Sequence, residues 1–396
     1  MPASRTRARH SEIPSAPVFP LKISFSATNP CHLYDMAREL HRQGALGRYY
    51  SGYPRWKLDP PEDFPVLARS ARTLATYAAL RLPHGLRPAD HRLFRWQDEG
   101  FDKAVARALG GDPSQMLHAL PGQALETFRA AHREGITTIL NHACGPVRQQ
   151  LALLEEEYRR AGIEQAAHHS FNASYLAREA AEYSLADRHC VASSVVRRQL
   201  LAAGIPEEKI WIVPYGADPA RFHPPESGDR RDPLKVVYAG QMTLRKGLRI
   251  ALAGLRSVRN SVPVTFDLYG SVSPDFTATM LNAQREEWVS FKGPVSQHAL
   301  ADIFRKAAVL VLPSWEEAFG LVVVQALNCG LPCVVSDRVG AADLIQHRRN
   351  GSIFPAGDDG ALAREVSWWL EHRSSFEFMP FHWEDPARRL LALSTN

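Results

Sequence analysis

The stretch AVLVLPSWEEAFGLVVVQALNCGLPCVVS, residues 308–336, decides the fold of this chain. It opens with an apolar run of strand length, passes through a loop that holds two acids, and enters a helical segment that ends at Gly330. A second apolar run, LPCVVS, follows directly. A strand, a helix and another strand in this order indicate two parallel strands joined by a crossover helix. The segment therefore predicts an α/β sheet whose two faces are covered by helices.

The same alternation extends over the rest of the chain. Strands are expected in LKISFSA (21–27), QMLHAL (115–120), TTILNHA (137–143), RHCVAS (188–193), KIWIVPYG (209–216), LKVVYAG (234–240), VTFDLYG and WVSFKG. Helices are expected between them, and a further helix is expected over residues 64–82, FPVLARSARTLATYAALRL. The repeated order predicts doubly wound parallel sheets, which bind ligands at the carboxyl ends of their strands.

A linker divides the chain into two expected domains. Residues 217–233, ADPARFHPPESGDRRDP, combine four prolines with many charges, a composition typical of linkers. The chain has 396 residues, a length that suits two domains. We expect a first Rossmann-like domain over residues 21–216 and a second over 217–380. Residues 1–20 are expected to form a disordered tail.

Composition excludes several classes of protein. The chain is 45% hydrophobic, and no apolar run approaches the roughly 18 residues that a membrane span needs. Five cysteines lack the paired spacing of zinc sites, which favours reduced thiols and a cytoplasmic protein. Residues 1–95 hold 15 Lys and Arg against 7 Asp and Glu. This basic quarter suggests an acidic partner, and because no nucleic-acid-binding signature is present, we expect an anionic membrane surface rather than nucleic acid.

Cations occupy the turn after the first strand of the second domain. In YAGQMTLRKGL, residues 238–248, the strand ends at Gly240, and Arg245 and Lys246 precede a helix that starts with Gly247. Two cations at a strand-to-helix turn suit a diphosphate, because they neutralise its charge while the helix amino terminus adds N–H donors. The alternative is a solvated Arg-Lys pair, and the motif alone leaves both interpretations open.

Two acids follow the buried strand of the opening stretch. Glu316 and Glu317 come before the small turn Ala318-Phe319-Gly320, and the helix that follows carries Gln325. A carboxylate and an amide at the carboxyl end of a strand suit sugar or ribose hydroxyls. The alternative is that the two acids cap the helix and complement its dipole. A third motif, RVGAADLIQHRRNGSIFPAGD at residues 338–358, places Asp343 between two glycine turns.

Together these three motifs resemble the family 4 glycosyltransferases, which have the two-domain GT-B fold. The resemblance implies two doubly wound Rossmann-like domains that face each other across a cleft, and a helix at about 381–396 that packs back on the first domain. The family's first acid matches Glu317, its "FGL" segment matches residues 319–321, and Gln325 stands at its second acid. The resemblance, to bacterial transferases of polysaccharide, lipopolysaccharide and cell-envelope assembly, is close over residues 180–360. It implies transfer of a sugar from a nucleotide-diphosphate sugar to a glycan or lipid-linked acceptor, with retention of configuration and no cofactor.

The resemblance also implies roles for single residues. Lys246 is expected to contact the donor diphosphate with Arg245 beside it, Glu317 to hold sugar hydroxyls, and the turn from Ala318 to Leu321 to present N–H groups to the phosphate. Gly240 and Gln241 belong to the same donor site, although Gln241 replaces a phosphate-binding Arg of many members, as Gln325 replaces a ribose-binding acid. These two replacements leave open a catalytically inactive sugar-nucleotide-binding protein, and the fold leaves open a sugar-nucleotide epimerase.

Three histidines are candidates on the side of the first domain. His142 ends a predicted strand and fits a family histidine near the donor sugar, so it joins Glu317 and Lys246 as an expected catalytic residue. His118 ends another predicted strand, and His32 follows the first; both are expected on the acceptor side. The alternative for each is a structural histidine. No D-x-D pair is present, and we therefore expect no metal.

Overall fold

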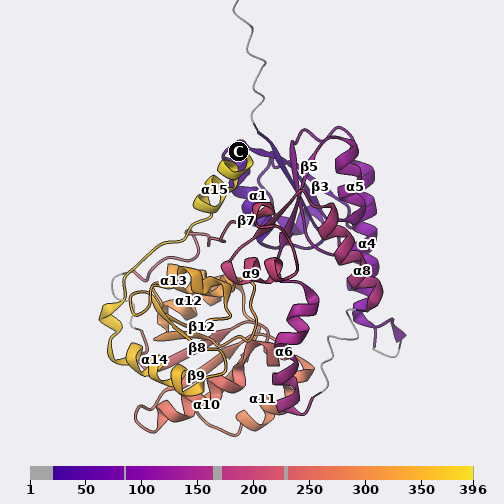
Figure 1. Ribbon diagram of the computed structural model, residues 1–396. Coiled ribbons are helices and arrows are strands. Elements are labelled where there is room, and N and C mark those ends of the chain that lie inside the picture. Colours follow the sequence, from indigo (N-terminus) through magenta and orange to yellow (C-terminus); the bar gives the residue numbers. More distant parts are fainter. Residues whose placement is uncertain (1–20, 84–85, 164–171, 227–230, 396) are drawn as a thin grey trace, which may run out of the picture.

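Two parallel sheets with crossover helices make up the chain, as the alternation predicted (Figure 1). The computed structural model describes residues 21–83, 86–163, 172–226 and 231–395. The tail expected at residues 1–20 lies outside these residues. Both sheets are parallel throughout. Counted along the chain within each sheet, six neighbouring strands have the order 3-2-1-4-5-6, which is typical of dinucleotide-binding folds.

The first sheet is seven-stranded, in the order β3-β2-β1-β4-β5-β6-β7. Its strands are β1 (Ile23–Ala27), β2 (Leu46–Ser51), β3 (Val66–Ala68), β4 (Met116–Ala119), β5 (Thr137–His142), β6 (Arg188–Val191) and β7 (Ile210–Ile212). Its helices are α1 (His32–Arg42), α2 (Arg55–Leu58), α3 (Ala71–Ala79), α4 (Asp90–Ala108), α5 (Leu125–Arg133), α6 (Val147–Ala161), α8 (Ala173–Leu185) and α9 (Ser194–Ala202).

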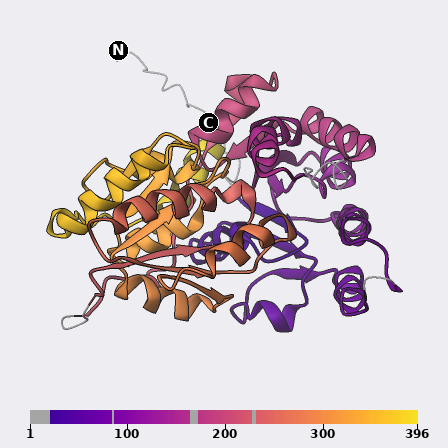
Figure 2. The ribbon, with the colours of Figure 1, turned by 90° about the horizontal axis from the view of Figure 1, so that it is seen from below.

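The second sheet is six-stranded, in the order β10-β9-β8-β11-β12-β13. Its strands are β8 (Lys235–Ala239), β9 (Thr265–Tyr269), β10 (Val289–Gly293), β11 (Val309–Leu312), β12 (Cys333–Ser336) and β13 (Gly351–Phe354). Helices α10 (Leu248–Arg259), α11 (Thr277–Ala283), α12 (Gln297–Lys306), α13 (Leu321–Asn328) and α14 (Asp359–Glu371) cover both faces of this sheet (Figure 2). Every residue of β11 is buried, which explains its continuous run of Val and Leu.

The last helix leaves the second domain and lies on the first. Helix α15 (Glu384–Ser394) contacts α1, and Arg389 donates a hydrogen bond from Nε to the carbonyl of Ile212 at the edge of the first sheet. The chain therefore passes from one domain to the other after β7 and returns before α15 (Figure 1).

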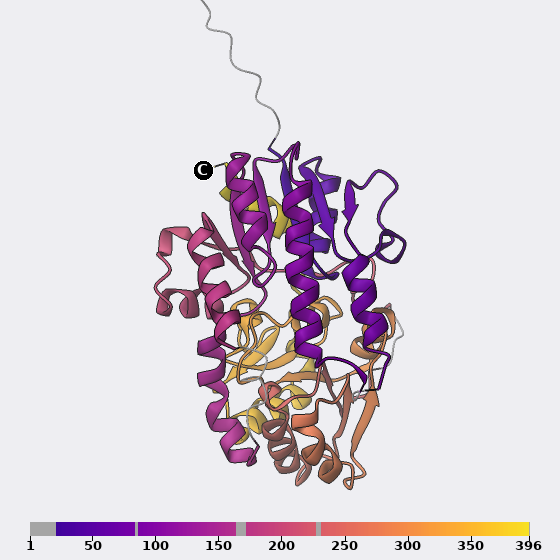
Figure 3. The ribbon, with the colours of Figure 1, turned by 90° about the vertical axis from the view of Figure 1, so that its right-hand side faces the viewer.

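One predicted element is partly wrong. Residues 64–82 were expected to form a single helix, but Val66–Ala68 is strand β3 and only Ala71–Ala79 is helical. The two helices α3 and α4 pack on each other and run side by side down one side of the molecule (Figure 3). Their sequence, rich in Pro and Arg at residues 81–95, gave no clear helical pattern for the start of α4.

Candidate active site

The turn from β8 to α10 brings Arg245 and Lys246 to the carboxyl edge of the second sheet. They belong to the short 3-10 helix η3 (Leu244–Lys246), and Gly247 follows with φ +65°. A Cβ atom on Gly247 would lie 1.9 Å from the carbonyl oxygen of Pro313, just past the end of β11. Glycine is therefore required here, because it lets this turn approach the loop that carries the two acids.

Both cations are paired with the two acids in this structure. Arg245 donates from Nη1 to the Oε2 atom of Glu316 and to its carbonyl oxygen, each at 2.9 Å. The ammonium of Lys246 forms an ion pair with the Glu317 carboxylate. The arrangement joins the first and second motifs, which are about 70 residues apart in sequence, into one charged cluster.

Electrostatics distinguish the two carboxylates. Burial acts to raise the pKa of Glu317, but Lys246 and Arg245 together hold it below its ordinary value. For Glu316, burial outweighs the attraction of Arg245 and raises the pKa. Glu317 is therefore the more firmly ionised of the two, as expected for a group that accepts hydrogen bonds from hydroxyls.

The turn at the start of α13 is held rigidly and carries unpaired donors. Gly340 and Ala341 donate backbone hydrogen bonds to the carbonyls of Glu317 and Phe319, at 2.9 and 2.6 Å. Gly320 has φ +90°, a conformation that favours glycine. Among the described residues, no acceptor is paired with the backbone N–H groups of residues 318–321. Such N–H groups at a helix amino terminus form a favourable site for a phosphate.

A cavity of about 460 Å³ lies between the two domains at this cluster. On the side of the second domain it is lined by Gln241, Thr243, Arg245, Ser273, Pro274, Asp275, Glu316, Glu317 and Ala318. On the side of the first domain it is lined by Ala143, Cys144, Val147, Gln150, Leu151, Leu154 and Tyr158. Most of the latter group lies on α6, which extends from the first domain along the second (Figures 1 and 3).

Polar contacts hold the domains together beside this cavity. The Tyr158 hydroxyl donates to the Asp275 carboxylate at 2.6 Å, and Glu157 lies 3.6 Å from Arg249. The Ser193 hydroxyl donates to the carbonyl of Ala318 at 2.6 Å. The sequence did not point to these residues, because no local motif marks a contact between domains.

Of the predicted donor-site residues, Gln241, Arg245, Glu317 and Ala318 line the cavity, and Lys246 is tied to it through Glu317. Gln325 lies one turn into α13, where its amide donates to the side chain of Gln297 at 3.1 Å. Gly240 directly follows the last residue of β8, Ala239, and precedes Gln241. Phe319 packs edge-on against Tyr215, a residue of the segment that joins the domains, and Leu321 begins α13.

The three histidines lie in the interior of the first domain. His142 is fully buried, and its Nε2 shares a hydrogen bond of 2.9 Å with Nδ1 of His189. Its side chain faces Tyr183, while the next two residues, Ala143 and Cys144, reach the cavity. Burial lowers the pKa of His142 well below its ordinary value. The structure therefore does not bring His142 to Glu317 and Lys246.

His32 and His118 are also buried. His32 bonds to Asn141 at 2.8 Å and stacks on Tyr215, with ring centres 4.2 Å apart, so it touches the segment that joins the domains. His118 stacks on Phe25, and among the described residues neither of its ring nitrogens has a hydrogen-bond partner. Burial lowers the pKa of His32 to about 4 and that of His118 to about 3.

The described residues contain no group of three or more His, Cys, Asp or Glu side chains arranged to hold a metal ion. None of their helices combines the length and the apolar character that crossing a bilayer requires.

Comparison with solved structures shows which fold this is. The Anabaena protein HepE, solved in complex with UDP and glucose, matches with a TM-score of 0.62 over 95% of this chain and 96% of HepE, at 14% identity. Such a likeness shows the fold, and the fold is GT-B, as the sequence predicted. Residues 233–372 match the family model described as Glycosyl transferases group 1. The matched residues make up most of the second domain, and they contain both cations and both acids of the cluster.

Two curated relatives extend the comparison. The amylovoran biosynthesis glycosyltransferase AmsK of Erwinia amylovora is 27% identical over 180 residues, which is 43% of this chain and 44% of AmsK. The chain thus spans less than half the length of AmsK. WcaL of Escherichia coli strain K12, named for colanic acid biosynthesis, is 24% identical over 293 residues, 70% of each chain.

Proposed function

We propose that this chain is a glycosyltransferase that moves a sugar from a nucleoside diphosphate sugar to a glycan or lipid-linked acceptor, in polysaccharide or cell-envelope glycan synthesis. The observation that carries the proposal is the cluster of Arg245, Lys246, Glu316 and Glu317 beside a cavity between two GT-B domains. The names of AmsK and WcaL, both polysaccharide biosynthesis proteins, support the class of product.

When the donor binds, Lys246 and Glu317 give up their ion pair and each contacts the donor instead. Its diphosphate takes the ammonium of Lys246 and accepts hydrogen bonds from the unpaired N–H groups of residues 318–321. Glu317, released from Lys246, then accepts hydrogen bonds from hydroxyls of the sugar. The ion pair between Lys246 and Glu317 thus keeps both groups ordered until the donor separates them.

The chemical step needs electrostatic stabilisation more than acid–base catalysis. As the bond from the anomeric carbon to the diphosphate breaks, negative charge grows on the leaving phosphate beside Lys246 and Arg245, while positive charge grows on the sugar. We propose that transfer retains the configuration of the sugar. We also propose that it uses no metal ion, because the charges of Lys246 and Arg245 stabilise the leaving phosphate in place of a metal cation. His142 has no role in this scheme, since it does not line the cavity.

The acceptor side of the proposal includes a membrane. Seven of the ten exposed large apolar side chains among the described residues lie between residues 56 and 96: Trp56, Leu74, Tyr77, Leu82, Leu86, Phe94 and Trp96. Exposed cations, among them Lys57, Arg69, Arg81 and Arg92, are interleaved with them. We call this the docking surface. Apolar side chains mixed with cations are typical of proteins that lie on anionic lipid.

Thermal shift measurements test the donor site. UDP, GDP and their sugars are compared, because a ligand that binds only the folded protein raises its melting temperature. Lys246→Ala should reduce the shift, since a charged hydrogen bond contributes about 1.5–3 kcal/mol, and Lys246→Arg should keep part of it. The matched control is Lys235→Ala at the opposite end of β8. If no nucleotide shifts the wild type, or Lys246→Ala behaves like the control, the proposed site is wrong.

Excess EDTA tests the metal-free scheme. Once an active donor and acceptor pair has been found, transfer should continue at an unchanged rate in EDTA. A loss of activity that manganese or magnesium restores would contradict the scheme.

A further inference from the structure

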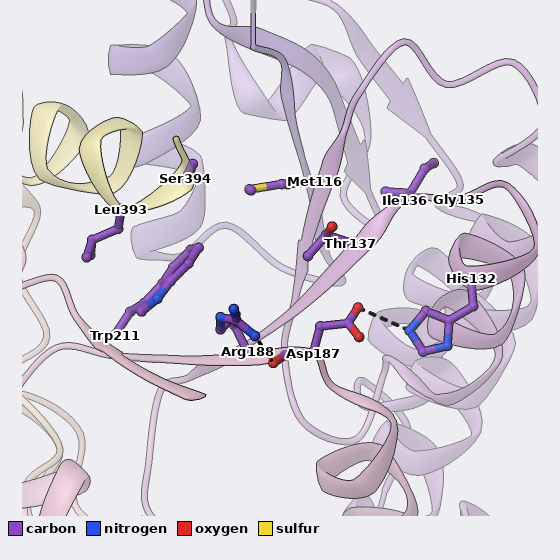
Figure 4. Close-up of a pocket in the computed structure, with 10 residues that line it drawn as sticks. All are labelled: Met116, His132, Gly135, Ile136, Thr137, Asp187, Arg188, Trp211, Leu393 and Ser394. Carbon is purple, nitrogen blue, oxygen red and sulfur yellow. Dashed lines mark hydrogen bonds and ion pairs between the residues drawn. The ribbon is translucent and has the colours of Figure 1, made fainter. Parts of the chain in front are cut away.

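A second cavity, of about 550 Å³, lies on the first domain away from the candidate active site (Figure 4). These elements line it: the end of α5, the amino ends of β4, β5 and β6, strand β7 and the last turn of α15. The lining residues are Met116, His132, Gly135, Ile136, Thr137, Asp187, Arg188, Trp211, Leu393 and Ser394. The candidate active site lies past the carboxyl end of β5. A six-residue strand spans roughly 20 Å, so the two cavities are distinct.

One side of this second cavity carries ordered polar groups. Asp187 accepts hydrogen bonds at Oδ2 from the backbone N–H of Thr138 at 2.8 Å and from its hydroxyl at 2.9 Å, and His132 lies 3.2 Å from the same atom. Burial acts to raise the pKa of Asp187, but these contacts lower it overall, so the carboxylate is ionised. Within the described residues, its Oδ1 atom accepts no hydrogen bond and stays available to a ligand.

The other side is apolar and centred on an indole ring. Trp211, Met116 and Leu393 form this wall, and the guanidinium of Arg188 lies 6.0 Å from the centre of the Trp211 ring (Figure 4). Arg188 donates from Nη1 to the carbonyl of Asp187 at 3.0 Å. In the part of the chain that the structure describes, neither its Nη2 nor the Trp211 Nε1 donates to a protein acceptor, so both remain available as donors.

We infer that this cavity binds a segment of neutral glycan. A sugar presents C–H groups on its faces and hydroxyls at its edge, and the indole wall and the polar groups of Asp187 and Arg188 match these two surfaces. The charges of Asp187 and Arg188 offset each other, which disfavours a phosphate or another multiply charged anion. The volume falls within the usual range of ligand pockets, about 300–1,000 Å³.

The inference rests on the proposed function for its purpose. A transferase that extends a polysaccharide gains from a second hold on the acceptor, because a linked second contact raises the effective concentration of the reacting end. The glycan site would then favour long acceptors over short ones, while the donor cavity alone performs the transfer.

Affinity electrophoresis tests the glycan site without donor or acceptor turnover. Each native gel contains one polysaccharide. Three gels contain a neutral one (dextran, galactomannan or xyloglucan), and a fourth contains alginate, which is anionic. The wild type should be retarded in a neutral gel and not in alginate. Trp211→Ala and Arg188→Ala should each weaken this binding about tenfold or more, as truncation of a central Trp or Arg does at interfaces. The matched control is Trp56→Ala, which removes an exposed indole 71% accessible to solvent on α2.

Two outcomes overturn the inference: no retardation in any neutral gel, or retardation that Trp211→Ala and Arg188→Ala leave intact. Arg188→Ala keeps the test valid if the larger Trp211→Ala truncation prevents folding. The thermal shift by nucleoside diphosphate, measured on the same variants, should be unchanged. If nucleoside diphosphates do not raise the melting temperature of the wild type, only the proposed function is contradicted, because retardation in the gel reports the glycan site independently.

Discussion

At the scale of single residues, Glu317 pairs with Lys246 in the structure, and the proposed scheme gives it the donor sugar as its second partner. Glu317→Gln removes the charge that holds Lys246, so bare nucleoside diphosphate should bind as tightly as in the wild type, or a few times more tightly. Turnover should fall by about tenfold to a hundredfold, because the amide is a weaker acceptor for sugar hydroxyls in the transition state. Calorimetry and steady-state kinetics measure the two effects separately.

The control for this prediction is Glu286→Gln, which breaks an ion pair with Arg256 on the surface of the same domain. It should change neither quantity. Equal losses of nucleotide binding and turnover in Glu317→Gln would instead assign Glu317 to the stability of the turn before α13.

His118 should make the first domain sensitive to acid. Its pKa falls to about 3 on burial, below its ordinary value of 6.5. A lowered histidine pKa contributes stability that is complete above pH 6.5 and is lost as the pH falls towards the folded pKa. The loss is about 1.4 kcal/mol for each pH unit. His118→Leu removes this loss, so the difference in melting temperature between variant and wild type should grow in favour of the variant between pH 6.5 and 4.

The variant must be compared with the wild type at each pH, because other buried groups change the stability of the protein with pH in the opposite direction. Burial raises the pKa of Asp98 to about 6 and that of Glu182 to about 7, so their protonation favours the folded state at low pH. These groups are present in both proteins and cancel in the difference. A difference that does not change with pH would show that His118 is not a buried neutral histidine.

At the scale of elements, one helix end links the two domains. The first turn of α9 belongs to the first domain, yet the backbone N–H and the hydroxyl of Ser194 both donate to the carboxylate of Asp343, each at 2.6 Å. Asp343 lies in the 3-10 helix η5 (Gly340–Leu344), the element whose N–H groups hold the turn before α13. Asp343 therefore connects the helix of one domain to the turn before α13 in the other.

Asp343→Ala should destabilise both the first turn of α9 and the turn before α13. Loss of a capping acceptor costs about 0.5–2 kcal/mol of stability. The nucleotide affinity should also fall several-fold, because η5 no longer fixes the turn. Asp358→Ala is the matched control, since Asp358 caps α14 within the second domain at 2.7 Å. It should lower the melting temperature similarly and leave nucleotide affinity unchanged; the same loss of affinity in both variants would refute the link.

The elements also show what the sequence could predict. Strands such as β11 were readable because both faces are buried and every residue is apolar. Strand β2 was not, because Gly47 and Arg48 interrupt its apolar pattern and only three residues separate it from α1. Helix α4 was not predicted, because only four of its 19 residues are buried and two of these, Gln97 and Asp102, are polar. Its burial depends on partners that the local sequence does not name.

The same limit applies to the site. Arg245, Lys246 and Glu317 could be found because each belongs to a local motif at the end of a strand. The wall formed by α6 could not, since the contact of Tyr158 with Asp275 joins residues 117 positions apart. For His142 the sequence predicted the position at the end of a strand but not the direction of the side chain, which strand alternation turns to the interior, towards His189.

At the scale of the whole molecule, the docking surface and the cavity set the expected orientation on a membrane. Helices α3 and α4 project from the first domain beside the second (Figure 3), and the tip residues Leu82 and Leu86 are 49% and 74% exposed. Arg72 is not part of the lipid contact in this interpretation, because its guanidinium lies over the Trp96 ring at 4.5 Å. A lipid-linked acceptor held in the membrane would then meet the protein on the side of the first domain.

Co-sedimentation with vesicles tests this orientation. The protein should bind phosphatidylglycerol vesicles at low salt, bind less as salt rises, and bind phosphatidylcholine vesicles weakly. Each cation near an anionic leaflet contributes about 1 kcal/mol, so replacing Arg69, Arg81 and Arg92 with Gln together should weaken binding about a hundredfold. The control replaces Arg256, Arg364 and Arg388 in the second half of the chain, which carries the same change in net charge. Equal losses in both triple variants would show that total charge, and not the docking surface, attracts the lipid. Absence of binding at low ionic strength would leave the first domain a binder of acceptors in solution.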